Sequence, residues 1–193
     1  MLFLYIHGFN SSPLSFKAQC FSQFITTKYT DDRCYTPSLS AFPVVAIRQL
    51  SMFIEQHLEQ SKVALIGSSL GGFYATFLSQ KYDLPAVLIN PVVNPHKLLI
   101  NYLAKNKNYY TEQKYELSYE HVKQLEALIV KQPTFPEKLM VLLQKGDDVL
   151  DYHLAEREYA RSHLLVEAGG NHSFENFSRH CDTIYTFLSK NRV

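Results

Sequence analysis

A serine at the centre of a glycine-flanked turn is the residue of this chain best suited to covalent chemistry. The motif GSSLG occupies residues 67–71, directly after an apolar run and directly before a helix-like run. A serine held on such a strand-to-helix turn presents its hydroxyl at the carboxyl end of a sheet, where it can act as a nucleophile. The bare pattern also fits a glycine-rich turn without chemistry. Ser69, rather than Ser68, occupies the central position and is the predicted nucleophile.

A serine nucleophile needs a base that accepts its proton and an acid that orients the base. The candidate base is His172, which follows two glycines in the loop between the last predicted strand and the last predicted helix. Because this loop leaves the same edge of the sheet as Ser69, the two side chains are predicted to meet. The competing interpretation is an ordinary loop histidine.

The acid is expected between the serine and the histidine, just after the penultimate strand. Three aspartates crowd there: Asp147, Asp148 and Asp151. Asp147 is the first choice because it lies nearest the strand end, and Asp148 remains the second. Asp151 is predicted to cap the next helix, where its carboxylate would accept hydrogen bonds from free amides.

An acyl intermediate also needs backbone N–H donors aimed at its developing negative oxygen. One donor is the residue after the nucleophile, Leu70, and the other is Phe9, in the loop that follows the first strand. Gly8 lets that loop approach closely. His7 lies on this side of the site and is predicted to hold the loop by hydrogen bonds rather than to act as the base.

Apolar runs alternate with helical patterns along the chain, which is typical of a parallel sheet covered by helices on both faces. Six strands are predicted, at residues 2–7, 33–36, 62–66, 86–90, 138–144 and 163–167. Ser12 is a candidate N-cap for the first helix, with Pro13 at its first position. Apolar stripes predict three core-facing helices: Leu14, Ala18, Phe21 and Ile25; Ile47, Leu50, Ile54 and Leu58; and Phe174, Phe177, Cys181, Ile184 and Leu188.

The segment 94–136 interrupts this alternation and carries no strand pattern. Residues 97–104 and 118–130 look helical, and a polar, tyrosine-rich stretch joins them. An excursion this long between two strands is either a packed helix pair or a cap over a site. We expect a single domain over residues 1–193 with 94–136 as a helical cap, whose residues shape an acyl pocket: Leu98, Leu99, Tyr102, Leu103, Tyr109 and Tyr110. The alternative is that its leucines only pack the helices onto the body.

The bulk composition narrows the class of partner. The chain has 193 residues and a net charge of +1, which gives no electrostatic case for binding nucleic acid. Its three cysteines are widely separated and favour reduced, buried thiols in a cytoplasmic protein over disulfides or a zinc site. The apolar N-terminal run is too short to span a membrane and lacks the features of a signal peptide. No cofactor or metal is expected, and the oligomeric state stays open.

Taken together, these motifs resemble the α/β-hydrolase fold, and more narrowly the YqiA-type group of small bacterial esterase-like hydrolases. The similarity covers nearly the whole chain and rests on four segments: HGFNSSP at 7–13, GSSLGGFYA at 67–75, GDDVL at 146–150 and GGNH at 169–172. The resemblance implies acyl hydrolysis by serine, histidine and aspartate in a bacterial cytosolic protein. Larger members of the fold have two further strands before the oxyanion strand, so a six-stranded, entirely parallel sheet is expected here.

The predicted function is therefore hydrolysis of a small carboxylic ester or thioester through an acyl-enzyme on Ser69. Two alternatives remain. One is a binding protein that keeps the turn without catalysis, and the other is an acyltransferase in which an alcohol or amine replaces water. The length of the acyl chain and the nature of the leaving group are left open.

Overall fold

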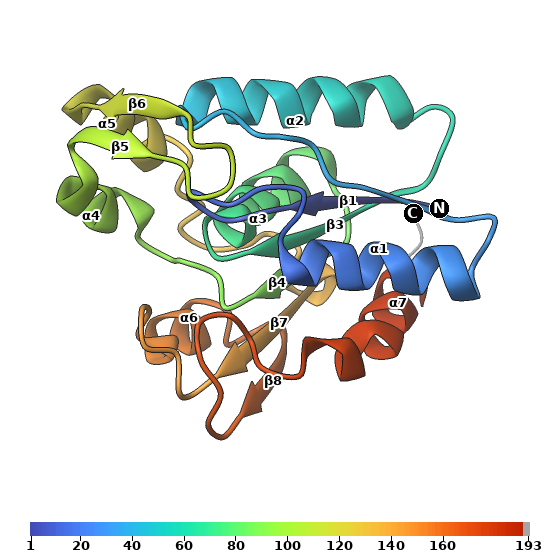
Figure 1. Ribbon diagram of the computed structural model, residues 1–193. Coiled ribbons are helices and arrows are strands. Elements are labelled where there is room, and N and C mark those ends of the chain that lie inside the picture. The colour runs from blue at the N-terminus through green and yellow to red at the C-terminus, as the bar shows by residue number, and fades with distance from the viewer. Residues whose placement is uncertain (191–193) are drawn as a thin grey trace.

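Six parallel strands form the central sheet of the computed structural model, which describes residues 1–190 (Figure 1). Their order across the sheet is β2-β1-β3-β4-β7-β8. The prediction of a six-stranded, entirely parallel sheet is confirmed. Each strand lies within about two residues of its predicted range: β1 (Leu2–Ile6), β2 (Arg33–Tyr35), β3 (Val63–Ser68), β4 (Ala86–Ile89), β7 (Leu139–Gln144) and β8 (His163–Glu167).

Helices cover both faces of the sheet and make two separate cores. Successive side chains of a strand point to opposite faces, so Phe3 and Tyr5 of β1 enter one core and Leu4 and Ile6 the other. The first core is closed by α1 (Phe16–Lys28) and α7 (Cys181–Lys190). The second is closed by α2 (Pro43–His57), α3 (Leu70–Tyr82) and α6 (Tyr152–Glu158).

Two of the three predicted helix stripes agree largely with the structure. Every residue of the last stripe is buried, but Phe174 lies before any helix and Phe177 begins a 3₁₀ turn (Phe177–His180), so only Cys181, Ile184 and Leu188 belong to α7. Leu50 and Ile54 of the second stripe are buried, whereas Leu58 lies beyond α2 and is partly exposed. The first helix begins later than predicted. Ser12 and its neighbours form a turn, in which the Ser12 hydroxyl accepts from the Leu14 amide at 3.1 Å, and α1 starts at Phe16. Leu14 is consequently exposed rather than part of the core.

The segment 94–136 is not purely helical, which corrects the prediction. It contains α4 (Pro95–Leu99), a 3₁₀ turn (Ile100–Tyr102) and α5 (Tyr119–Glu126), but an antiparallel hairpin lies between them, formed by β5 (Ala104–Lys107) and β6 (Lys114–Leu117). Both strands are short and polar, with most side chains exposed, so they lack the apolar pattern by which a strand is recognised. A further 3₁₀ turn (Pro136–Lys138) leads back into β7.

Two other sequence predictions can be compared with the described residues. Among residues 1–190, no helix combines the length and the apolar character that crossing a membrane requires. None of the three cysteines forms a disulfide. Cys181 is buried as predicted, whereas Cys20 and Cys34 are only half-buried.

Candidate active site

Ser69 occupies a strained turn between β3 and α3. Its backbone angles are φ 56° and ψ −119°, a region that residues other than glycine rarely adopt and that costs on the order of 1–3 kcal/mol. Surrounding hydrogen bonds hold it there: the Ser69 amide donates to the Ile89 carbonyl at 3.0 Å, and its own carbonyl accepts from the Gly72 amide at 2.9 Å. A Cβ on Gly71 would lie 2.0 Å from the Ile6 carbonyl oxygen, so this position admits only glycine.

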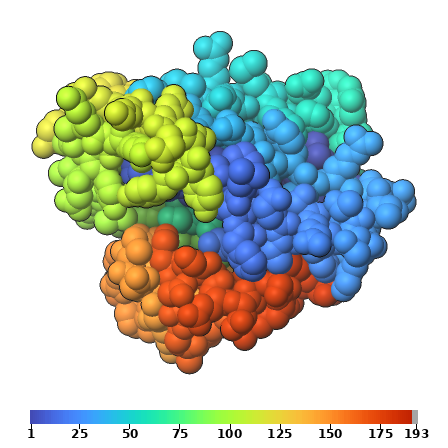
Figure 2. All heavy atoms as spheres, in the orientation of Figure 1, coloured from blue at the N-terminus to red at the C-terminus, as the bar shows by residue number. Residues whose placement is uncertain are grey.

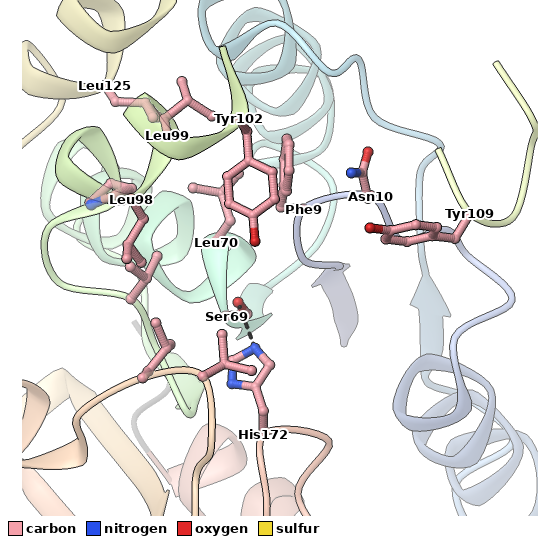
Figure 3. A pocket seen from close by; sticks show the side chains of 14 residues that line it. Phe9, Asn10, Ser69, Leu70, Leu98, Leu99, Tyr102, Tyr109, Leu125 and His172 are labelled. Carbon is pink, nitrogen blue, oxygen red and sulfur yellow. Dashed lines mark hydrogen bonds between the residues drawn. The ribbon is translucent and has the colours of Figure 1, made fainter. Parts of the chain in front are cut away.

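The Ser69 hydroxyl faces the His172 ring (Figure 3). Nε2 of His172 lies 3.1 Å from Ser69 Oγ, and Nδ1 of the same ring lies 2.8 Å from Asp147 Oδ2. Three residues that are far apart in the sequence thus form one hydrogen-bonded chain. The geometry is that of a nucleophile, a base and an orienting acid.

The Asp147 carboxylate is held in its charged form although its side chain is only 2% exposed. Burial raises its pKa, but the hydrogen bond from His172 and those from the Leu150 and Val149 amides outweigh burial, and the pKa lies below its usual value. The two amides donate to Oδ1 at 2.8 and 2.9 Å, which leaves Oδ2 for His172.

The two neighbouring aspartates take other positions. Asp148 is exposed, and its Oδ1 accepts from the backbone amide of His172 at 3.3 Å rather than from the ring. Asp151 is the N-cap of α6 and accepts from the His153 amide at 3.0 Å, so the prediction of a capping role is confirmed.

Two buried amide side chains, neither of them predicted from the sequence, hold the His172 loop against the sheet. Gln144, 2% exposed, accepts from the Asn171 and Glu175 amides at 3.2 and 2.8 Å through Oε1. Asn90, 3% exposed, donates to the carbonyls of Asn171 and His172 at 3.1 and 3.4 Å. The only feature of the sequence that could have indicated Asn90 and Gln144 is that each is a polar residue at the end of an otherwise apolar predicted strand.

The two predicted oxyanion donors come from neighbouring loops. Ile6 at the end of β1 pairs with Gly67 of β3, so the loops that carry Phe9 and Leu70 leave the sheet side by side. Leu70 is the first residue of α3, where an amide has no partner within the helix. Within residues 1–190, neither amide donates a hydrogen bond, so both are free to bind an oxygen. A Cβ on Gly8 would lie 3.7 Å from Ser69 Oγ, which shows how closely this loop approaches the hydroxyl.

His7 is buried beneath this loop. Its Nδ1 bonds to the Gly8 carbonyl at 3.0 Å, and burial lowers the pKa of its ring. This contact agrees with the predicted role of holding the loop.

A cavity of about 200 Å³ opens above Ser69 (Figure 3). Leu98, Leu99 and Tyr102 from the 94–136 segment line it, together with Leu125 of α5, and none of its lining residues is an aspartate, glutamate, lysine or arginine. Tyr109 also lines the cavity, whereas Leu103 and Tyr110, which were predicted to shape it, do not. Among the described residues, no three histidine, cysteine, aspartate or glutamate side chains gather to hold a metal ion.

Solved structures with the same arrangement of elements are α/β hydrolases and esterases. Est1E from Butyrivibrio proteoclasticus, in a structure with bound ferulic acid, matches with a TM-score of 0.78 and 10% identity, over 98% of this chain and 88% of that one. Alpha/beta hydrolase domain-containing protein 10 from mouse matches with a TM-score of 0.72 and 15% identity, over 98% and 90% of the two chains. These similarities show that the chain has the α/β-hydrolase fold.

The sequence also matches the profile of the uncharacterised protein family UPF0227 over residues 2–189. This match spans nearly the whole chain and agrees with the resemblance that the motifs predicted. The chain therefore belongs to the UPF0227 family, the YqiA-type group of the α/β-hydrolase fold.

Proposed function

We propose that this protein is a serine hydrolase that cleaves a carboxylic ester or thioester through an acyl-enzyme. The observation that carries the proposal is the hydrogen-bonded chain from Asp147 through His172 to Ser69 at the foot of an uncharged cavity. A strained backbone at a serine that is hydrogen-bonded to a histidine and, through it, to an aspartate is typical of acyl-transfer sites rather than of structural turns.

In the proposed reaction, Ser69 Oγ attacks the acyl carbon while Nε2 of His172 accepts the hydroxyl proton. Nδ1 of His172 carries the ring hydrogen and donates a hydrogen bond to Asp147. Nε2 therefore has a free lone pair and can act as the base. The Phe9 and Leu70 amides bind the oxyanion. His172 then returns the proton to the leaving alcohol or thiol, and a water molecule, activated by the same ring, releases the acid and restores Ser69.

The cavity favours a neutral, apolar acyl group of modest size. No charged aspartate, glutamate, lysine or arginine lines it to pair with a charged substrate, and its volume of about 200 Å³ is below the roughly 300–1,000 Å³ of pockets for drug-sized ligands. The ferulic acid bound by Est1E is consistent with acyl binding on this fold.

Labelling with a fluorophosphonate probe tests the proposal, because only an activated serine reacts irreversibly. We expect labelling at Ser69 together with hydrolysis of chromogenic esters. A protein that neither labels nor hydrolyses any ester or thioester is a binding protein. Acyl transfer to an added alcohol or amine in preference to water identifies a transferase.

Asp147→Asn should lower kcat by about 10⁴-fold because it favours the wrong tautomer of the His172 ring, with the hydrogen on Nε2 instead of Nδ1. The Leu150 and Val149 amides at Oδ1 would keep the new carbonyl oxygen on their side, which turns the amide nitrogen toward Nδ1. Nδ1 must then accept, so Nε2 carries the hydrogen and cannot take the serine proton. Steady-state kinetics on a short ester measure the effect.

Asp148→Asn is the matched control for this substitution. Its side-chain oxygen can still accept from the His172 amide, so we expect less than a tenfold change in kcat. If Asp148→Asn is instead the more damaging change, the role of the acid moves to Asp148.

Shortening the tyrosines of the cavity should shift the preferred chain length of the substrate. Tyr102→Ala and Tyr109→Ala each enlarge the cavity, and each additional buried methylene is worth about 0.8 kcal/mol, or about fourfold in kcat/KM. Tyr102→Ala also removes the edge-to-face contact with Phe9, so Tyr109→Ala isolates the effect of volume. The optimum is therefore expected to move to longer acyl chains with little change in Tm, measured with a series of p-nitrophenyl esters.

Leu103→Ala is the control, since Leu103 packs against the core beside the cavity without lining it. It should lower Tm and leave the ester profile unchanged. If the tyrosine variants behave in the same way, the segment is scaffold and the acyl group binds elsewhere.

A further inference from the structure

The loop at residues 8–11, which carries the Phe9 amide, is tied to the β5–β6 hairpin by side chains from the hairpin and the turn before it. The Tyr115 hydroxyl donates a hydrogen bond to Asn10 Oδ1, and Asn108 Nδ2 donates to the Ser11 carbonyl at 3.0 Å. The ring of Tyr102 meets that of Phe9 edge to face, with centroids 5.2 Å apart. Figure 2 shows the yellow-green hairpin region against the blue N-terminal segment.

This loop needs support because its own backbone holds it weakly. It is a four-residue turn closed by one long hydrogen bond, from the Ser11 amide to the Gly8 carbonyl at 3.3 Å. Asn10 has a positive φ of 52°, which a residue with a side chain adopts at some cost. The Phe9 N–H shares a peptide plane with the Gly8 carbonyl, which is bonded to the Ser11 amide and to His7 Nδ1, so the positions of Asn10 and Ser11 help to set the direction of this N–H.

Tyr115 is itself firmly placed. It lies in β6, half-buried, and its ring packs on Phe42 at the start of α2 with centroids 6.3 Å apart. Burial is the main cause that raises the pKa of its hydroxyl to about 12, so the group stays protonated and remains a donor at any working pH.

Asn108 is fixed from the opposite side. Its Oδ1 accepts from the Tyr110 and Thr111 amides at 2.9 and 3.0 Å, which caps the loop of the hairpin. The two hydrogen bonds orient the side-chain amide, so Nδ2 faces the Ser11 carbonyl. The hairpin thus supplies two donors that are already oriented, the Tyr115 hydroxyl for Asn10 and the Asn108 amide for Ser11.

We propose that Tyr115 and Asn108 are positioning residues that hold the Phe9 amide in the direction an oxyanion requires. The inference rests on the proposed function. It gives the hairpin a role in catalysis distinct from shaping the cavity, because neither Tyr115 nor Asn108 lines the cavity above Ser69. A donor aimed at the oxyanion acts in the transition state more than in the ground state, so its loss affects kcat more than KM.

The test uses Tyr115→Phe and Asn108→Asp. The first removes only the hydroxyl and keeps the ring on Phe42. The second removes the donor to Ser11 while keeping an oxygen for the Tyr110 and Thr111 amides. Tyr119→Phe is the matched control: it lies in the same segment, is 64% exposed, and loses a hydroxyl with no partner at this loop.

Each test variant should lower kcat on a short ester by about tenfold, the value of one hydrogen bond, with KM within about twofold of wild type. Inhibition by a trifluoromethyl ketone, which places an oxyanion in the same site, should weaken by the same factor. A purely structural role would lower Tm without this parallel change. If Asn108→Asp fails to fold, Tyr115→Phe decides the matter.

Wild-type kcat and inhibition in Tyr115→Phe would overturn the inference alone. So would a loss of kcat without any loss of ketone binding. A wild-type protein that hydrolyses no ester or thioester would overturn the proposed function and this inference with it, so the two failures are distinguished by the wild-type assay.

Discussion

Replacing Ser69 with alanine is expected to abolish hydrolysis of an activated ester, with a loss in kcat of about 10⁴- to 10⁶-fold. The variant lacks the oxygen that forms the acyl-enzyme, and only binding and oxyanion stabilisation remain to accelerate attack by water. Alanine meets the strained backbone angles no worse than serine does, so Tm should change little. Kinetics on a p-nitrophenyl ester and loss of fluorophosphonate labelling measure the effect.

Ser68→Ala is the matched control for this prediction. Ser68 is the last residue of β3, is buried and is paired with Ile89 in the sheet, one position before the turn. Removing its hydroxyl should leave most of the activity and the labelling intact. An inactive Ser68→Ala beside an active Ser69→Ala would mean that the nucleophile has been assigned to the wrong serine.

The centre of the sheet could be predicted from the sequence because its four inner strands, β1, β3, β4 and β7, are buried on both faces, whereas the edge strands β2 and β8 are partly exposed. Residues 2–6 and 139–144 read as continuous apolar runs, and such runs are typical of parallel strands between helices. The last helix was predicted for a related reason: its apolar stripe, which includes Ile184 and Leu188, has the spacing of one helix face.

The hairpin could not be predicted in this way, because its strands gain little from burial. Lys105, Lys107 and Lys114 are exposed, and the pairing depends on the backbone and on the Asn108 cap of the loop. The start of α1 was placed too early for a similar reason. Ser12 uses its hydroxyl in a local turn, which the pattern of polar residues does not distinguish from a helix cap.

Some residues of the candidate site could likewise be predicted from the sequence, and others could be identified only in the structure. The order of Ser69, an aspartate and His172 along the chain, each after a strand, predicted which loops meet at one edge of the sheet. The choice between Asp147 and Asp148 depends on the direction of a side chain in a tight loop, which the structure supplies through the two amides that orient Asp147. Asn90 and Gln144 were missed because their contacts join segments distant in sequence.

His172→Ala should be as inactive as Ser69→Ala, because the serine loses the base that accepts its proton. The loop itself should stay in place, since Asn90 and Gln144 bond to its backbone rather than to the imidazole. The loss is therefore chemical, and Tm should remain close to wild type. His153→Ala, an exposed histidine on α6, is the control and should keep full activity.

The double variant Ser69→Ala/His172→Ala distinguishes a coupled pair from two independent contributions. If the two residues act as a unit through the 3.1 Å contact between Oγ and Nε2, the second substitution removes nothing further, and kcat of the double variant equals that of either single variant. Two independent contributions would instead multiply. A His172→Ala variant that keeps substantial activity, or a double variant far below both singles, would remove His172 from the role of base and leave the Ser69 turn without a chemical partner.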